Sequence, residues 1–162
     1  MLKIFTKVFI IILLLQSISM AREINLNDIS KSAVKSNKTL FVFLHKTNCG
    51  YCENMMDFTL DDDKIKAFIE KKFLFVHINI SEKDDVIYKN FKGNTQDFAK
   101  YIGYDFYPTS LFFDEENDLS YVVPGYKDEE KFFKILNYVD SKSYDRTSFR
   151  SYENEFDFKK KL

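Results

Sequence analysis

The only two cysteines of the chain stand in the motif Cys49-Gly50-Tyr51-Cys52, directly after the apolar run 40–44. A buried strand that leads into this spacing places a dithiol at the N-terminus of a helix. There, free backbone N–H groups and the helix dipole stabilise a thiolate. Because the thiolate is the form that attacks disulfides, the motif indicates thiol–disulfide exchange.

An inert structural disulfide and a metal site are the other interpretations of this pair. A bridge across two residues closes a very small loop and contributes about 2 kcal/mol on the chain-entropy model, near the low end for disulfides. Zinc sites take four ligands, and only His45 lies close to the cysteines in sequence. We therefore favour a redox-active pair and expect no metal and no cofactor.

The N-terminus has the layout of a secretory signal peptide. Its only charges are Lys3 and Lys7, an apolar run follows over 8–15, and small residues at Ser19 and Ala21 precede a possible cut. We expect cleavage after Ala21 and export to the periplasm. An uncleaved anchor is the alternative, although the apolar run is shorter than the roughly 20 residues that a bilayer requires.

The mature chain, residues 22–162, is long enough for one domain with its own core. Removal of two lysines and no acidic residue takes the net charge from -1 to -3. No basic stripe is present, so nucleic acid is not an expected partner. In an exported protein thiols are usually paired, and this chain offers one possible pair.

Hydrophobic patterning predicts an alternation of strands and helices. Strands are expected at 39–45, 73–80, 109–113 and 119–123, and helices at 27–36, from about 49, up to about 71, at 95–102 and at 128–139. The charged segment 81–94 is interpreted as an excursion or lid outside the core. This order predicts an α/β fold with a mixed sheet.

At this point the chain resembles the thioredoxin superfamily, from about Leu40 to Val139. Four landmarks come in the family's order: the strand with Cys-x-x-Cys, the strand 75–80, Tyr107-Pro108-Thr109 at the start of a hairpin, and Gly125-Tyr126 after it. Within the superfamily it is similar to small exported bacterial proteins of the SoxW and thioredoxin-related kind. The resemblance implies a three-layer fold with a mixed central sheet flanked by helices, an insertion before the cis-proline loop and a C-terminal helical extension.

Together with the N-terminal pattern, the resemblance predicts a signal peptide at 1–21, a thioredoxin-like domain at 22–140 and a partly helical extension at 141–162. In that extension Tyr144, Phe149, Tyr152 and Phe156 are expected to pack a last helix onto the domain or a partner.

Roles for individual residues follow from the same resemblance. Cys49 would be the attacking thiol and Cys52 the resolving thiol of a redox-active disulfide. Pro108 is the candidate cis-proline, which would present the Tyr107 backbone to an extended substrate, with Tyr51 also in contact. An ordinary proline at a strand entry is the alternative interpretation of Pro108.

Two departures from the family concern the proton of Cys52. The buried acid that thioredoxins carry six residues before the first cysteine is replaced by Phe43, and Asn48 stands where they tend to have Trp. His77 lies where they often have a lysine near that acid, so we expect its imidazole to accept the proton. His45 competes for this role, and a histidine that merely satisfies a backbone carbonyl or water is the alternative.

The function implied is a periplasmic thiol–disulfide oxidoreductase that reduces disulfides of cysteine-containing proteins or of small molecules. A membrane or periplasmic thiol would supply its electrons, and a monomer is expected. A disulfide isomerase or oxidase uses the same chemistry, and a non-catalytic binding module is the alternative from another class.

Overall fold

The structure, a computed structural model, describes residues 22–160. The predicted signal peptide lies outside the described residues, and so does the prediction of cleavage after Ala21. Among the described helices, none combines the length and the apolar character that crossing a bilayer requires.

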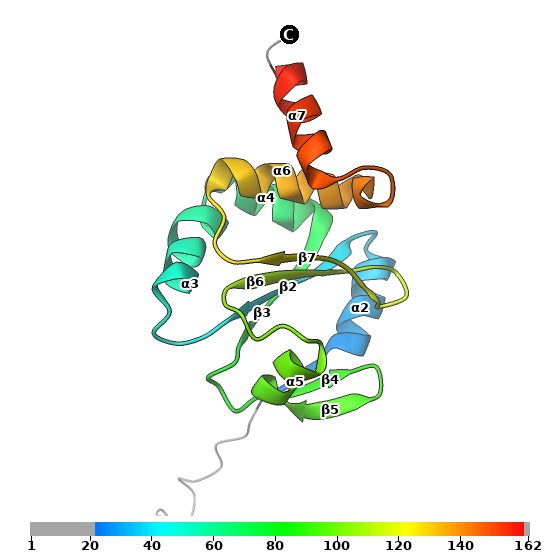
Figure 1. Ribbon diagram of the computed structural model, residues 1–162. Coiled ribbons are helices and arrows are strands. Elements are labelled where there is room, and N and C mark those ends of the chain that lie inside the picture. The colour runs from blue at the N-terminus through cyan, green and yellow to red at the C-terminus, as the bar shows by residue number, and fades with distance from the viewer. Residues whose placement is uncertain (1–21, 161–162) are drawn as a thin grey trace, which may run out of the picture.

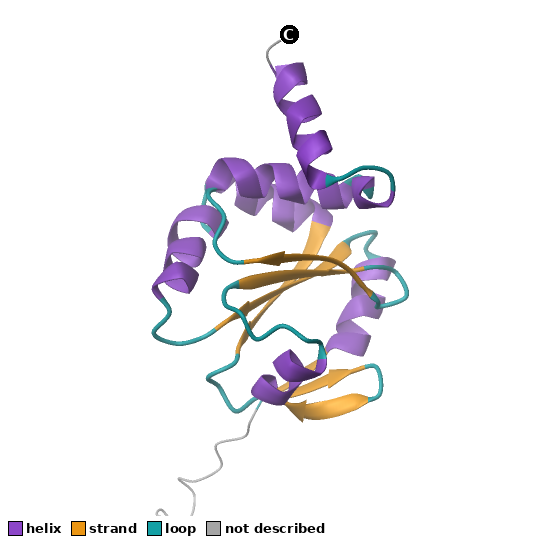
Figure 2. Cartoon of the chain, in the orientation of Figure 1, coloured by secondary structure: helices purple, strands orange, loops and turns teal. Residues whose placement is uncertain are grey.

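A four-stranded mixed sheet forms the centre of the fold (Figure 2). Its strands, in spatial order, are β3 (Phe73–Asn79), β2 (Thr39–His45), β6 (Thr109–Phe113) and β7 (Leu119–Pro124). Strand β2 runs parallel to β3 and antiparallel to β6. Every residue of β2 after its first is buried. Its continuous apolar sequence is what a strand covered on both faces requires.

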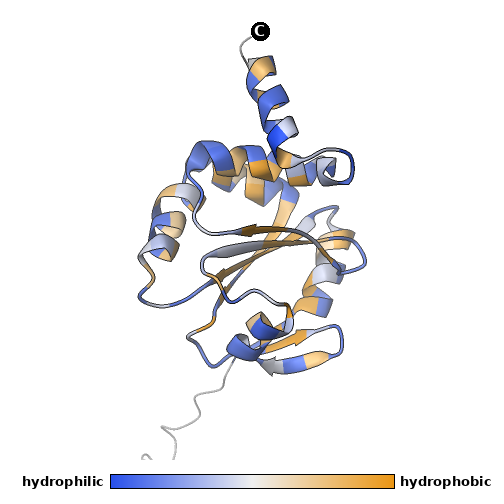
Figure 3. Ribbon diagram, in the orientation of Figure 1, coloured by the Kyte–Doolittle hydropathy of each residue, from blue (hydrophilic) through white to orange (hydrophobic). Residues whose placement is uncertain are grey.

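One face of this sheet is covered by α3 (Gly50–Asn54), α4 (Asp63–Lys72) and α6 (Glu129–Asp140) (Figure 1). The core on this side is rich in phenylalanine, with Phe41 stacked on Phe112 at a centroid distance of 4.8 Å. Figure 3 shows the amphipathic colouring of these helices. Their apolar residues recur at helical spacing, and burial of that stripe against the sheet holds the layer in place.

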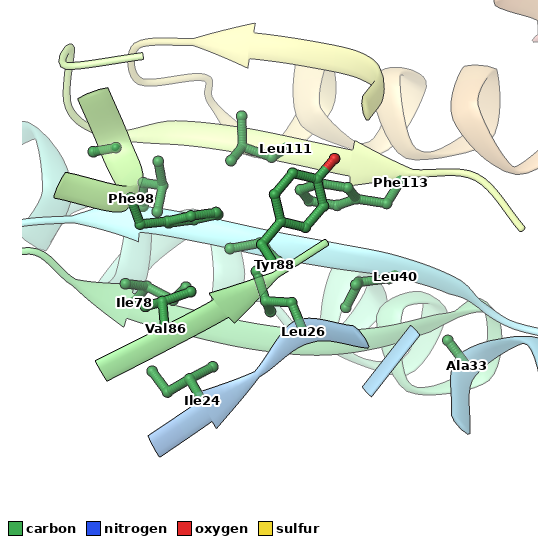
Figure 4. Packing of buried hydrophobic residues seen from close by; sticks show 13 residues of the cluster. Ile24, Leu26, Ala33, Leu40, Ile78, Val86, Tyr88, Phe98, Leu111 and Phe113 are labelled. Carbon is green, nitrogen blue, oxygen red and sulfur yellow. The ribbon is translucent and has the colours of Figure 1, made fainter. Parts of the chain in front are cut away.

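The other face carries α2 (Leu26–Lys35) and α5 (Thr95–Tyr101), with a second hydrophobic cluster between them and the sheet (Figure 4). The side chain of Asn25 caps α2 by accepting hydrogen bonds from two backbone N–H groups of its first turn. The strand and helix boundaries predicted from the sequence agree with the structure to within about one or two residues, as expected for element ends.

The interpretation of segment 81–94 as a lid outside the core is wrong. It forms β4 (Asp85–Tyr88) and β5 (Phe91–Asn94), which join β1 (Glu23–Asn25) in a three-stranded sheet of order β1-β4-β5. Val86 and Tyr88 are buried in the cluster of Figure 4. The charged residues at 82–85 gave this segment the appearance of a loop, so its two short strands were not predicted. The parallel partner of β4, β1, lies far away in the sequence.

The predicted last helix is confirmed as α7 (Phe149–Lys160), preceded by a short 3-10 helix, Ser143–Asp145. It rises away from the sheet and meets α6 near its own first turns (Figure 1). Aromatic pairs join the two helices, with Tyr138 in contact with both Phe149 and Tyr152. The ammonium of Lys134 lies 2.8 Å from Asp157 and extends the contact along α7.

We predict that Val86→Ala reduces the free energy of unfolding by about 2 kcal/mol. The side chain of Val86 is fully buried, so its truncation leaves a cavity in the core. Urea unfolding followed by circular dichroism would measure the loss. The exposed Lys83→Ala variant is the matched control from the same segment and should change stability little. Equal stability of both variants would restore the interpretation of 81–94 as a lid.

Candidate functional site

The two cysteines lie at the junction between β2 and α3. Cys49 is the N-cap of α3, and its sulfur accepts a hydrogen bond from the backbone N–H of Cys52 at 3.2 Å. Asn48, just before it, has a φ of 56°, in the left-handed region that Asn tolerates better than most residues. The tight turn explains why a small polar residue stands where a tryptophan was expected from the resemblance.

Cys49 and Cys52 form a disulfide. Cys49 is 8% exposed, whereas Cys52 is fully buried. The two residues between them are exposed, and Tyr51 presents 69% of its surface to solvent. Of the two cysteines, only Cys49 has any solvent exposure, so an incoming thiol or disulfide is expected to meet Cys49 first.

The Tyr107–Pro108 loop lies at the same end of the sheet as the cysteines. Leu44, near the end of β2, pairs with Thr109 at the start of β6, so the loop precedes β6 at the edge where β2 ends. The Tyr107–Pro108 peptide bond is cis. The carbonyl of Pro108 accepts a hydrogen bond of 2.7 Å from the backbone N–H of Gly125. The third and fourth landmarks of the sequence are therefore bonded to each other.

Aromatic and basic side chains surround this loop. Phe106 is 62% exposed, and Tyr107 is half-buried, with the ammonium of Lys46 at 5.9 Å from its ring centroid. Burial raises the pKa of Tyr107, and the nearby carboxylate of Asp105 raises it further. Tyr107 thus stays a neutral phenol at neutral pH.

The structure brings the two histidines of the chain together. Nε2 of His45 lies 3.3 Å from Nδ1 of His77, and their rings stack. His77, the expected proton acceptor, is exposed, while the competing His45 is 7% exposed. The contact that the structure gives the ring of His77 is therefore with a second imidazole. Its role as a proton acceptor stays a prediction.

Phe43 is fully buried and pairs directly with His77 in the β2–β3 register. Its ring stacks on that of His45 at a centroid distance of 5.6 Å. Burial lowers the pKa of His45, the charge on His77 lowers it further, and Glu82 acts in the opposite direction. His45 is consequently neutral at neutral pH and able to accept a proton.

No pattern in the sequence predicts the contact between the helical segment after the cysteines and the loop after β7. Residues Met55–Leu60 continue α3 as a π-helical segment, in which the sulfur of Met55 accepts a hydrogen bond from the backbone N–H of Lys127. The hydroxyl of Thr59 donates to the carbonyl of the same Lys127 at 2.7 Å. Such π-helical turns are rare and occur often at functional sites.

Lys127 also holds the loop that supports the cis-proline. Its ammonium donates to the carbonyls of Pro124, Gly125 and Tyr126, and burial lowers its pKa. The helix that carries the cysteines and the loop bonded to Pro108 are therefore tied to one residue. Within residues 22–160 no group of three or more metal-ligating side chains is found.

Comparisons with known proteins agree with this geometry. A sequence model of the thioredoxin-like domain matches residues 26–140, so the chain belongs to the thioredoxin-like domain family. Among curated proteins, no relative is found. The fold predicted from the sequence is confirmed: a thioredoxin-like fold that carries a Cys-x-x-Cys disulfide.

Solved structures resemble this one across most of their length. A thioredoxin-fold protein from Helicobacter pylori is 19% identical with a TM-score of 0.60, and the match covers 76% of this chain and 93% of that one. A thioredoxin from Thermus thermophilus is 19% identical at 0.58, with 74% and 86% covered. The C-terminal domain of DsbD from Neisseria meningitidis, in its reduced form, is 16% identical at 0.51, with 69% and 91% covered.

We predict that Asn48→Val lowers the free energy of unfolding by about 1–2 kcal/mol, because a β-branched residue fits poorly at positive φ. Asn48→Gly, which adopts this conformation without strain, is the matched control. Urea unfolding of the oxidised proteins compares the two. An Asn48→Val variant as stable as Asn48→Gly would contradict the strained turn before Cys49.

Stability should also depend on pH through His45. Its pKa is lowered in the folded state, so below the ordinary value of about 6.5 the unfolded chain binds a proton that the folded chain does not. We predict that the free energy of unfolding falls as pH drops from 7.5 to 5.5, and falls less in His45→Gln. Urea titrations at several pH values would test this, and parallel profiles for the two proteins would contradict it.

Proposed function

We propose that this protein is an exported thiol–disulfide oxidoreductase that reduces disulfides by dithiol exchange through Cys49 and Cys52. The observation that carries the proposal is the asymmetry of the pair: a partly accessible sulfur caps a helix, and a fully buried one lies one turn further on. An attacking and a resolving thiol require this arrangement, because only one sulfur meets the substrate.

In the first step the Cys49 thiolate attacks one sulfur of a substrate disulfide and forms a mixed disulfide, and the other substrate sulfur leaves as a thiolate. In the reduced protein the backbone N–H of Cys52 is placed to stabilise the attacking Cys49 thiolate. Cys52 then attacks Cys49, restores the internal disulfide and releases the reduced product. A thiol donor, in the membrane or the periplasm, must afterwards reduce the pair again.

Substrate binding is assigned to Tyr51 and to the Tyr107–Pro108 loop. The exposed Tyr51 lies beside the reactive sulfur, and the loop lies at the same end of the sheet. An extended segment of a cysteine-containing protein fits such a surface by pairing with backbone groups, as in β-strand addition. Small disulfides would use the same sulfur with fewer contacts.

The direction of electron flow follows from how strongly the reduced form is stabilised. Strong oxidants owe their potential to a highly stabilised thiolate. Here the sulfur of Cys49 accepts one backbone hydrogen bond, and the nearest cation in sequence is Lys46, whose ammonium lies over Tyr107. This modest stabilisation supports a reductant. Export to the periplasm is part of the proposal and is supported by the sequence pattern of residues 1–21.

Single substitutions of the two cysteines separate catalysis from binding. We predict that Cys49→Ser abolishes reduction of insulin disulfides, while Cys52→Ser accumulates a mixed disulfide that a resolving thiol can no longer release. Turbidity of reduced insulin and mass spectrometry of the trapped species are the readouts. Retained partner binding with no insulin reduction by the unmodified protein would instead support a binding module.

The equilibrium potential of the pair against glutathione tests the direction. A reductant should lie near thioredoxin, at about -270 mV, and a value near -120 mV would overturn the assignment in favour of an oxidant.

A further inference from the structure

The mechanism leaves the proton of Cys52 without an acceptor. Cys52 is fully buried and must lose its proton before it attacks the mixed disulfide. Phe43 occupies the position where an acid was expected, and its fully buried ring cannot accept a proton. Another group of this chain has to do so.

The candidate acceptor lies on the face of β2 that packs against the helix of the cysteines. Phe43 and Met55 belong to the same buried cluster, so this face of β2 packs against the helix that follows the motif. Cys52 lies three residues before Met55, on the same side of that helix. Side chains alternate along a strand, so His45 shares the face of Phe43, and their rings stack. His45 is thus the basic side chain at the end of β2 on the side of Cys52.

The contact between the histidines leaves His45 one ring nitrogen to use. Nε2 of His45 faces Nδ1 of His77 at 3.3 Å, and one of the two must carry the hydrogen between them. In the described part of the chain, Nδ1 of His45 takes part in no hydrogen bond. With the hydrogen on Nε2 of His45, its Nδ1 carries an open lone pair.

We propose, on the basis of the proposed function, that the His45–His77 pair replaces the missing acid: buried His45 takes the proton of Cys52, and exposed His77 hands a proton to solvent. This proposal reverses the roles expected from the sequence, in which His77 was the acceptor and His45 its competitor. His77 acts through His45 and is a positioning and relay residue.

The step moves one proton from Cys52 through the two histidines to water and one electron pair to the departing substrate sulfur. The Cys52 proton moves to Nδ1 of His45, and the resulting thiolate attacks the sulfur of Cys49. The bond between Cys49 and the substrate sulfur breaks, and its electron pair leaves with the substrate as a thiolate. His45 then passes its Nε2 proton to Nδ1 of His77, which releases its own Nε2 proton to water.

The surroundings of His45 keep it in the neutral form that accepts a proton. Burial lowers its pKa, and His77 on β3 lowers it further, whereas Glu82 in the loop after β3 raises it. The helix that carries the cysteines packs on the same face of β2, where Phe43 and Met55 share one cluster. The adjacent Lys46 is exposed, with its ammonium over Tyr107. The carboxylate of Glu82 therefore favours the imidazolium formed during the step.

A chromogenic disulfide separates the two chemical steps in one experiment. When the reduced full-length protein reacts with 5,5′-dithiobis(2-nitrobenzoate), attack by Cys49 releases one coloured thiolate. Attack by Cys52 on the mixed disulfide then releases a second. Stopped-flow absorbance from pH 5 to 9, with a chelator present to remove trace metal, gives both rates. In the unmodified protein the second rate should level off once His45 is neutral.

His45→Gln and His45→Asn keep a polar atom near one ring nitrogen or the other but cannot titrate in this range. Both should slow the second release about tenfold or more near pH 6.5, and the second rate should then rise with pH toward the titration of the thiol itself. The first release should keep its pH profile. His77→Gln should slow the second release less than His45→Gln, and the exposed Lys83→Ala is the control for substitution itself.

Rescue provides a readout that loss of structure alone would not give. Added imidazole should accelerate the second release in His45→Ala and leave Lys83→Ala unchanged. An unaltered second release in both His45→Gln and His45→Asn would overturn the histidine pair while leaving the oxidoreductase intact. A first release no faster than that of a simple thiol peptide would instead overturn the proposed function.

Discussion

Burial of β2 on both faces is the constraint on which the rest of the structure depends. The strand is covered by α2 and its cluster on one side and by the phenylalanine-rich core on the other, and β3 and β6 flank it in the sheet. A shift of its register by one residue would exchange the side chains that fill the two clusters and disrupt the packing of both. Its last residue therefore fixes where the chain turns into α3 and where Cys49 lies.

The sequence contained most of this information. The apolar run of β2, the Cys-x-x-Cys spacing and the landmarks at Pro108 and Gly125 are local patterns, and they sufficed for the fold and for the two sulfurs. Short elements paired over long distances were not predictable in the same way. Strand β4 is four residues long, follows a charged stretch and is ordered by β1, more than 60 positions earlier. Tertiary context decides such strands.

The site shows the same division between local and distant information. The resemblance predicted which cysteine would attack and which would resolve, but the burial of His45 and the exposure of His77 depend on where β3 lies in the sheet. Strand β3 is an edge strand of the four-stranded sheet, so His77 reaches solvent although it pairs with a fully buried phenylalanine. The hydrogen bond from the backbone N–H of Lys127 to the sulfur of Met55 joins residues 72 positions apart, and no periodicity of the sequence predicts it.

The attachment of the π-helical segment to Lys127 has a mechanical consequence. The dithiol helix and the loop bonded to Pro108 share one anchor, so a displacement of either is transmitted to the other. Under the proposed function, an extended polypeptide that docks beside Cys49 would meet a preorganised site in place of two independently mobile loops. Less conformational entropy is lost on association, and the geometry between sulfur and docked backbone is kept from one encounter to the next.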